Sequence, residues 1–249
     1  MTSKICKTIA ILQSSYIPWK GYFDLINMVD EFILYDTVQF TKNDWRNRNI
    51  IKTDNKTQWL TIPVNTSGKF GQKIYETIVS DHRWITKHCS AIRTYYSRAT
   101  YFDEYFSMIQ QTYEKCLHED YLSTINYLFI MAVCKILGIK TSVKWSTDYE
   151  YSDCDDKTMR LIQICKSANA TQYISGPSAS SYIDKSMFNK ENIKLSYIDY
   201  SSYPIYNQLH ENFIHQVSIL DLIFNEGPNA YKYLKSFINN NPTKTQELG

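Results

Sequence analysis

The sequence predicts an α/β protein whose mainly parallel sheet is flanked by helices. Strand-like and helix-like segments alternate in both halves of the 249-residue chain. The first unit, a strand, a loop, a helix and a second strand, occupies residues 7–38, an order that predicts two neighbouring parallel strands. Hydrophobic residues make up 43% and charged residues 21% of the chain, as in ordinary globular proteins with a sizeable core.

The spacing of apolar residues places the elements of the first half. Residues 7–15 form a buried strand that ends in polar side chains, and residues 21–30 carry apolar side chains at helical intervals. A second strand at 31–38 follows at once, and a third is expected at 59–65. The polar insertion between these two strands indicates a hairpin around Asp54.

After a helical lobe, the second half continues the alternation. Residues 81–138 have helical patterns, and Gly138 is a suitable carboxyl cap. The elements expected beyond it are strands at 140–149, 171–176 and 193–200, a helix at 155–169, and helices at 217–238 that break near Gly227. We therefore expect one domain over 1–249 with a Rossmann-like sheet, a helical lobe at about 81–138 and a flexible polar tail at 239–249.

Composition and charge exclude several classes of protein. The net charge of +2 is too small for a general nucleic-acid-binding surface. The longest apolar stretch, 127–139, contains Lys135 and is too short to span a bilayer, so no membrane insertion is expected. Residues 5–13 lead into a polar motif rather than a cleavage site, which argues against a secretion signal. Six scattered cysteines without a CxxC pair suit a reducing cytoplasm, the expected location.

Polar side chains follow almost every predicted strand, and ligands bind beyond the carboxyl ends of the strands in open parallel sheets. The candidate residues at these ends are Gln13, Tyr16, Asp36, Gln39, Ser175, Gly176, Ser178, Tyr182, Tyr206 and Gln208. Because the carboxyl ends of parallel strands share one edge, we expect Gln13, Asp36, Ser175 and Tyr206 to line one crevice.

Two segments of this rim are distinctive. In "QSSYIPWKGYF", residues 13–23, Trp19 and Tyr22 are three apart and can meet on one side of a helical turn, so the segment is expected to form the floor of a site. In "SGPSASSY", residues 175–182, small residues allow a close approach of the backbone to a ligand. The same sequence is also consistent with an ordinary turn followed by a helix that a serine caps.

The segment "TKNDWRNRN", residues 41–49, is the strongest charged feature. Arg46 and Arg48 alternate, so on an extended segment both would face one side and could fork onto a phosphate. Lys42 and Asn47 belong to the same candidate clamp. The alternative is a solvated charged loop, which is the usual fate of such runs.

Motifs for metal binding and nucleophilic catalysis are missing from the sequence. The five histidines show no metal-ligand spacing, no cysteine lies in a nucleophile motif, and no Walker loop or GxGxxG occurs, so neither a metal nor a cofactor is expected. If a proton must be taken up, His88 is the best candidate base, since aromatic and basic residues surround it. A lone histidine is also often structural.

Long stretches of the chain resemble the WbqC-like proteins. The opening block "IAILQSSYIPWKGYFDLINMVDEFILYDTVQFTKNDWRNRN" is the most specific, and "WLTIPV", "HCSAIRTYYSRATYF", "YISGPSASSYID" and "SILDLIFNEGP" follow in the same order, so the resemblance covers about residues 7–230. One departure is Tyr203-Pro204, where the family pattern has a histidine before the proline. There is also a faint similarity to nucleotidylyltransferase-like folds, but their HxGH and KMSKS-type motifs are missing from the sequence.

The resemblance implies a role in the biosynthesis of bacterial surface polysaccharides, such as O-antigen or capsule, since genes of this family lie among those for such sugars. The leading hypothesis is an enzyme that transfers an acyl or aminoacyl group to the amine of a nucleotide-linked sugar. The donor would be a charged tRNA or a thioester. In this hypothesis Gln13, Asp36 and His88 form the catalytic set. Arg46 and Arg48 hold phosphates, while Tyr16, Trp19 and Tyr22 stack on a base or sugar.

Two other functions stay open. Glycosyl transfer from a nucleotide sugar would use a DxD-type metal site. The one candidate for it is "DCDD" at 153–156, a segment that is also typical of the amino-terminal end of a helix. A non-catalytic binding or scaffold protein of the polysaccharide machinery would bind the same ligand without turnover.

Overall fold

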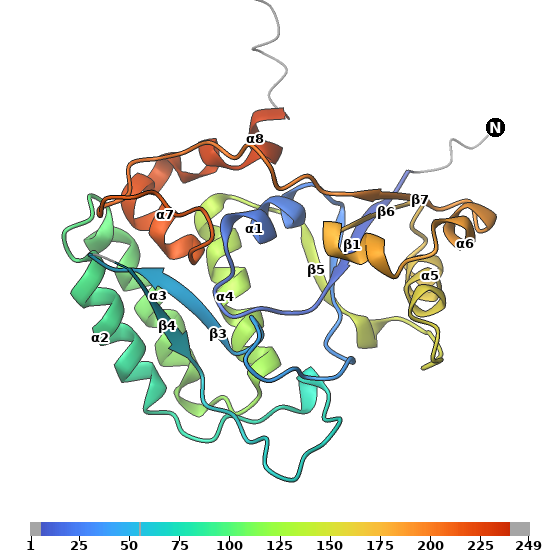
Figure 1. The fold of residues 1–249 in the computed structure, drawn as a ribbon, viewed down its shortest axis with the longest axis horizontal. Helices are drawn as coiled ribbons and strands as arrows, with labels where there is room; N and C mark the ends of the chain where they lie inside the picture. Colours follow the sequence, from blue (N-terminus) through green and yellow to red (C-terminus); the bar gives the residue numbers. More distant parts are fainter. Residues whose placement is uncertain (1–5, 55, 240–249) are drawn as a thin grey trace, which may run out of the picture.

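The computed structural model describes residues 6–54 and 56–239 and contains a five-stranded, fully parallel sheet in the order β5-β2-β1-β6-β7 (Figure 1). Its strands are β1 (Thr8–Leu12), β2 (Glu31–Leu34), β5 (Ser142–Trp145), β6 (Gln172–Ser175) and β7 (Lys194–Tyr197). Each lies within a segment predicted as a strand, and β1 and β2 are parallel neighbours as expected. The predicted α/β class is therefore confirmed.

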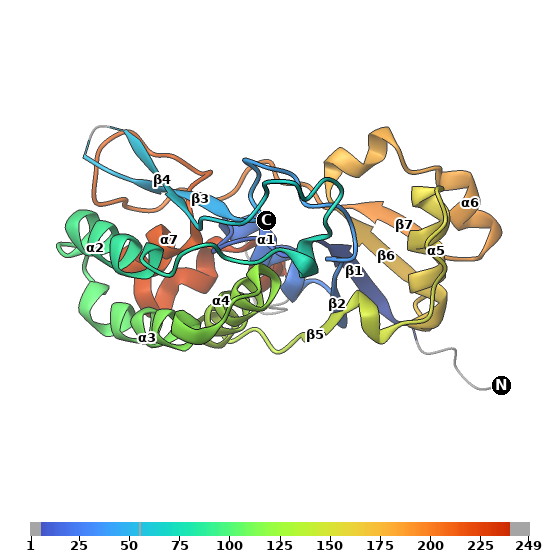
Figure 2. The same cartoon turned by 90° about the horizontal axis from the view of Figure 1, so that it is seen from below.

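Both faces of the sheet are buried, because successive side chains of a strand point to opposite faces. Ile9 and Ile11 of β1 pack into one apolar cluster with α5 (Lys157–Ser167) and α6 (Lys185–Lys190). Ala10 packs into the other cluster, with α1 (Lys20–Asn27) and α4 (Leu122–Leu137). Figure 2 shows α5 and α6 at the side of the sheet away from α2 (Trp84–Tyr96), α3 (Phe102–Lys115) and α4.

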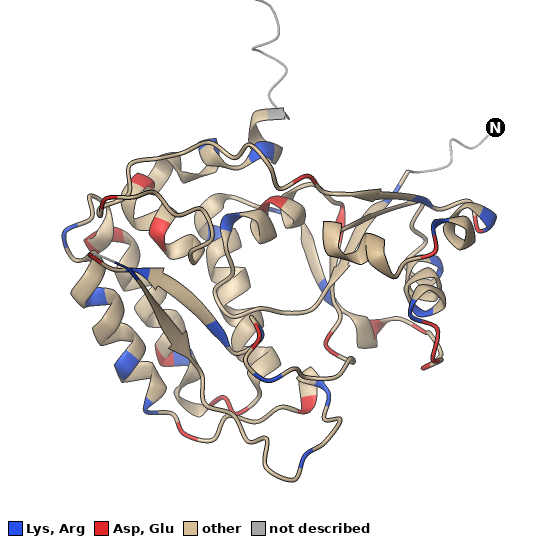
Figure 3. Ribbon diagram, viewed as in Figure 1, with Lys and Arg blue, Asp and Glu red and all other residues tan. Residues whose placement is uncertain are grey.

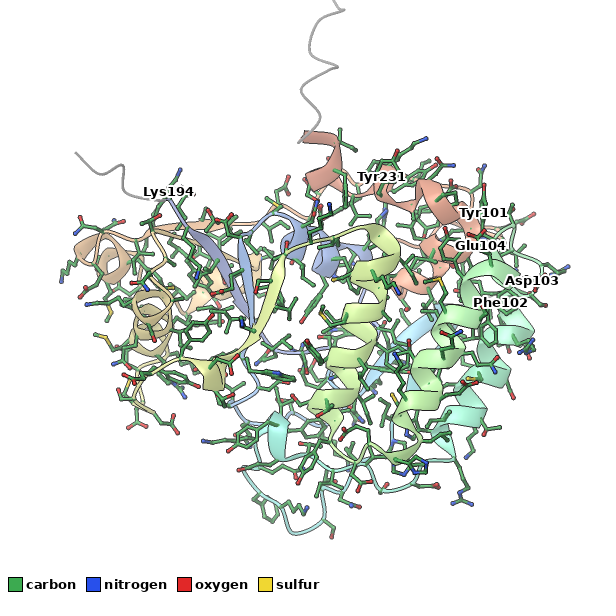
Figure 4. The ribbon with its side chains drawn as sticks, turned by 180° about the vertical axis from the view of Figure 1, so that it is seen from behind. Tyr101, Phe102, Asp103, Glu104, Lys194 and Tyr231 are labelled. Atoms are coloured by element: carbon green, nitrogen blue, oxygen red, sulfur yellow. The ribbon has the colours of Figure 1, made fainter. Side chains whose placement is uncertain are left out.

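The predicted helical region at 81–138 contains α2 (Trp84–Tyr96), α3 (Phe102–Lys115) and α4, and Gly138 closes α4 in the left-handed conformation at φ 71°. The C-terminal helices are α7 (Ile219–Glu226) and α8 (Lys235–Asn239), and α7 ends where expected, before Gly227. Tyr101 lies at the amino end of α3, as Figure 4 shows. A Cβ on Gly227 would lie 2.4 Å from that ring, so the close packing requires glycine.

The strand expected at 59–65 differs from the prediction. It appears as β4 (Thr57–Thr61), which pairs with β3 (Arg48–Lys52) in an antiparallel hairpin outside the main sheet. Only a short turn joins the two strands, which favours antiparallel pairing, whereas a parallel strand would need a long crossover. The polar character of the insertion concealed β3, whose Ile51 is fully buried.

Two further expectations concern the chain as a whole. No helix in the described part of the chain is both long and apolar enough to cross a membrane. The flexible tail expected at 239–249 lies outside the described residues, apart from Asn239 at the end of α8.

Candidate functional site

A cavity of about 1070 Å³ opens at the carboxyl ends of β1, β2 and β6. Gln13 and Ser15 line it after β1, Tyr35 and Thr37 after β2, and Ser175 at the end of β6. Its volume slightly exceeds the usual range for small-molecule sites, about 300–1,000 Å³. The location agrees with the rule that ligands bind beyond the carboxyl ends of parallel strands.

The loop after β1 reaches the cavity through a strained backbone. Ile17 has φ 39°, a left-handed conformation that a β-branched residue rarely adopts. Surrounding groups hold it there: the Asn49 amide donates to the carbonyl oxygens of Tyr16 and Ile17 at 3.0 and 2.8 Å, and the Ser218 hydroxyl donates to Ile17 O at 2.9 Å. Such over-determined strain gathers at ligand sites, because it fixes the positions of neighbouring side chains.

Arg46 brings a nearly buried cation to the cavity wall, with 9% of the residue exposed. Its Nη1 donates to Gln13 Oε1 at 3.0 Å, and the amide of Asn126 donates to its backbone oxygen at 2.9 Å. The Arg46 Nε is buried without a hydrogen-bond acceptor among the described residues, and the nearest carboxylate oxygen, from Asp44, lies 3.8 Å away. A buried guanidinium that is only partly satisfied favours an anionic ligand.

A second group of cations lies around the start of α5. Asp156 caps this helix by accepting hydrogen bonds from the amides of the next turn, and Lys157 and Arg160 then line the cavity three residues apart. Asp153 pairs with Arg160 at 3.0 Å and with Lys73 at 3.4 Å, which links α5 to the loop before η1 (Ile74–Glu76). Acidic and basic side chains are interspersed at this helix start, as they are over the rest of the fold (Figure 3).

Aromatic side chains form much of the remaining wall. The Tyr22 hydroxyl donates to Gln13 O at 3.0 Å, and the Trp19 and Tyr200 rings meet edge to face with centroids 5.0 Å apart. A Cβ on Gly21 would lie 2.3 Å from the indole of Trp19, so glycine permits this packing. Burial raises the pKa of Tyr22 well above its usual range and that of Tyr200 to about 12, so both phenols keep their protons at neutral pH.

About half of the candidates from the sequence lie together in this cavity. They are Gln13, Trp19, Tyr22, Gln39, Arg46, Ser175, Gly176, Ser178 and Tyr182. They come from segments that are distant in sequence and meet because the parallel strands share one carboxyl edge.

Tyr16 and His88 lie elsewhere, in the core. The Tyr16 hydroxyl is 2.8 Å from His88 Nδ1 and 2.6 Å from the Tyr113 hydroxyl, and the Tyr16 ring is fully buried. Burial lowers the pKa of His88 to about 4. Tyr16 was expected to stack on a ligand and His88 to act as a base, and both expectations are corrected. The two side chains are buried in the core, where they lie within hydrogen-bonding distance of each other.

Asp36, Tyr206 and Gln208 are also held away from the large cavity. Asp36 accepts from Ser14 N at 2.8 Å and from the Ser123 hydroxyl, and it lines a separate cavity of about 250 Å³ near β5. The Tyr206 hydroxyl donates to buried Asp221 at 2.7 Å. The Gln208 amide donates to Ile214 O at 2.8 Å. The single crevice expected for Gln13, Asp36, Ser175 and Tyr206 thus holds only Gln13 and Ser175.

The charged segment at residues 41–49 is also divided, because Arg46 lines the large cavity whereas Lys42, Asn47 and Arg48 do not. Residues 42–47 form turns and β3 begins at Arg48, so Arg46 and Arg48 do not lie on one extended stretch and do not share a side. Arg48 stacks on Trp59, with its Cζ 4.1 Å from the ring centroid, and Lys42 is exposed on the turn. The Asn47 amide donates to Ile62 O at 2.9 Å, just beyond the open end of the hairpin.

Several cavity residues were not among the sequence candidates, notably Trp45, Lys73, Lys157 and Arg160. A signal existed for Lys157 and Arg160: a helix that follows a parallel strand begins at the carboxyl edge of the sheet, so its first turn belongs to the rim. Lys73 carried no such signal, since only the folded loop brings it near Asp153.

Comparisons with known proteins agree with the sequence pattern. The model of the WbqC-like protein family matches residues 13–233. A protein of Mycobacterium tuberculosis described as uncharacterised is 47% identical over 229 residues, which cover 92% of this chain and 98% of that protein. No solved structure matches the chain, so its Rossmann-like character stays a prediction.

Proposed function

Because this chain belongs to the WbqC-like protein family, we propose that it acts in the biosynthesis of a bacterial surface polysaccharide. In this proposal the large cavity binds a nucleotide-linked amino sugar, and the protein transfers an acyl or aminoacyl group to the sugar amine. A charged tRNA or a thioester serves as the donor. The family is consistent with the general role, and the cavity supports the substrate class.

One observation carries the substrate class: four cationic side chains and only two carboxylates line a cavity that is otherwise rich in aromatic, hydroxyl and amide groups. Arg46, Lys73, Lys157 and Arg160 supply charge for phosphates. Gln13 and Ser175 offer groups that both donate to and accept from sugar hydroxyls. This combination suits a ligand that joins phosphates to a polar ring.

The acyl step needs a proton acceptor, since the amine loses a proton as its nitrogen bonds to the acyl carbon and the donor's leaving group departs. His88 is too far inside the core to serve. Asp44 replaces it in the proposal, because its carboxylate lines the cavity on the side of Gln13 and Arg46.

Binding without turnover is the second candidate function. The described residues that line the cavity include neither a histidine nor a cysteine, and both carboxylates, Asp44 and Asp153, lie beside cations. Glycosyl transfer is less favoured: in the segment proposed for a DxD-type site, Asp153 pairs with two cations and Asp156 caps α5.

Mass spectrometry after incubation with a panel of nucleotide amino sugars and acyl donors tests the proposal. We expect one pair to give a sugar nucleotide heavier by the acyl group, and Asp44→Asn to reduce the yield while retaining nucleotide binding. Saturable binding with no product from any pair would favour the second candidate, and no binding at all would reject both.

A further inference from the structure

Trp45, Trp59 and Arg48 form a layered stack at the edge of the large cavity. The two indole rings lie with centroids 5.5 Å apart and planes inclined by 36°, and the Arg48 Cζ is 4.1 Å from the Trp59 ring centroid. Trp45 is 43% exposed and Trp59 is 45% exposed. Trp84, by contrast, is 2% exposed and packs within the Tyr16–His88 cluster.

The pairing register of β3 and β4 brings Arg48 and Trp59 of the stack together. Trp59 of β4 lies opposite Ile50 of β3, and Arg48 lies two residues before Ile50 on the same face of the strand, so Arg48 is a diagonal neighbour of Trp59. An Arg48 terminal nitrogen also donates to Asn43 O, which ties the guanidinium to the turn that carries Trp45.

The backbone of Trp45 is fixed from two sides. Its carbonyl oxygen accepts a hydrogen bond from Tyr16 N at 3.0 Å, and its amide donates to Asp44 Oδ1 at 2.7 Å. Trp45 lines the cavity, whereas Trp59 and Arg48 do not. Trp45 is thus the member of the stack that lines the cavity, with Trp59 packed against it and Arg48 packed against Trp59.

We propose that Trp45 is the stacking face for the nucleobase of the substrate, and that Trp59 and Arg48 are positioning residues that hold this indole in place. The inference rests on the proposed function and deepens it, because it assigns the base end of the ligand to the hairpin side of the cavity. Arg46 follows Trp45 directly and lines the same cavity, so in this proposal the nucleoside attached to a phosphate on Arg46 lies within reach of the indole. Arg48 thereby acts through Trp59 rather than on phosphate.

Titration of the full-length protein tests this assignment. UDP, dTDP, GDP and ADP, their free nucleosides, and a sugar 1-phosphate without a base are titrated by calorimetry and by tryptophan fluorescence. Trp45→Ala should weaken the best nucleoside diphosphate by about tenfold to a hundredfold, since stacking is lost. Tyr231→Ala removes a partly exposed aromatic of the C-terminal region (Figure 4) and serves as the control, with unchanged affinity.

The two positioning residues have their own signature. Trp59→Ala and Arg48→Ala should weaken the nucleoside and its diphosphate by the same factor of a few fold, whereas Arg46→Ala should weaken only the diphosphate. Melting curves confirm that each variant is folded.

Three outcomes overturn the inference. One is a Trp45→Ala variant that binds nucleotides as wild type does. Another is an equal loss for the base-free sugar phosphate, which would mean that the indole stacks on the sugar. The third is an Arg48→Ala loss confined to the diphosphate. In all three the proposed function survives, whereas failure of the wild-type protein to bind any nucleotide overturns both.

Discussion

The large cavity and the Tyr16–His88–Tyr113 cluster use similar residue types in opposite ways. In the cluster, the phenols and the imidazole are buried and lie within hydrogen-bonding distance of one another. In the cavity, Arg46 Nε lacks an acceptor among the described residues and Trp45 keeps an exposed ring. The difference teaches that unfilled hydrogen-bonding capacity and an exposed aromatic ring, rather than residue type, distinguish the candidate binding surface from the structural core in this protein.

The largest expected effect is a loss of folding stability at acidic pH, caused by the buried His88. Burial lowers its pKa to about 4, while an unfolded histidine titrates near 6.5. As the pH falls from 6.5 towards 4, the unfolded state takes up a proton that the folded state refuses, so stability falls with it, by up to about 3 kcal/mol. Above pH 6.5 this contribution to stability is fully present.

Urea denaturation of wild type and His88→Gln at pH 7.5 and pH 4.5 measures this effect. The difference between the two proteins isolates His88, because all other titrating groups are shared. A wild-type protein that loses no more stability than His88→Gln over this interval would show that the histidine is not held neutral in the core.

Removing the Arg46 guanidinium should weaken ligand binding in the cavity while leaving the protein folded. Charge-assisted hydrogen bonds contribute about 1.5–3 kcal/mol, so Arg46→Ala should weaken binding of a nucleoside diphosphate roughly tenfold or more. Lys42→Ala, on the exposed part of the same turn, is the matched control and should bind normally. Calorimetric titration measures the affinity of each variant for the nucleoside diphosphate. Equal affinities for Arg46→Ala and Lys42→Ala would show that Arg46 is not part of the binding site.

Tyr16→Phe should show the reverse pattern. Loss of the hydroxyl leaves His88 Nδ1 and the Tyr113 hydroxyl short of a buried partner, which costs about 1–3 kcal/mol of stability. Nucleotide affinity should stay at the wild-type value, because Tyr16 does not line the cavity. A variant that keeps its melting temperature but loses binding would place Tyr16 back in the site.

Asp153→Asn should have the smallest effect on stability. Asp153 is exposed, and exposed ion pairs contribute about 0–1 kcal/mol, so the melting temperature should hardly move. Because Lys73 and Arg160 lose their shared carboxylate, a nucleoside diphosphate should bind a few fold more tightly at low salt. Weaker binding would instead make Asp153 a ligand contact.

Much of the fold could be predicted from the sequence, because β1 and β2 are short apolar runs and the later strands alternate with helical patterns, an order that favours a parallel sheet. The sequence indicated a hairpin around Asp54, but it did not reveal β3 or its pairing outside the main sheet, because polar residues outnumber the buried Ile51 in that segment. For the candidate site, the strand-end rule placed Gln13 and Ser175 at the sheet edge where the cavity lies, but it could not separate Tyr16 from Tyr22. Both lie in one loop-and-helix segment, and the left-handed backbone of Ile17, which the sequence does not reveal, lies between the buried Tyr16 and the cavity-lining Tyr22.

The central claim is that the cavity at the sheet edge binds a nucleotide-linked ligand and the buried cluster does not. The most direct measurement is the affinity of a nucleoside diphosphate for wild type, Arg46→Ala and Tyr16→Phe at low and high salt. We predict single-site binding to wild type and Tyr16→Phe that weakens as salt rises, and much weaker binding to Arg46→Ala. Undetectable binding to wild type, or a loss in Tyr16→Phe as large as that in Arg46→Ala, would contradict the account.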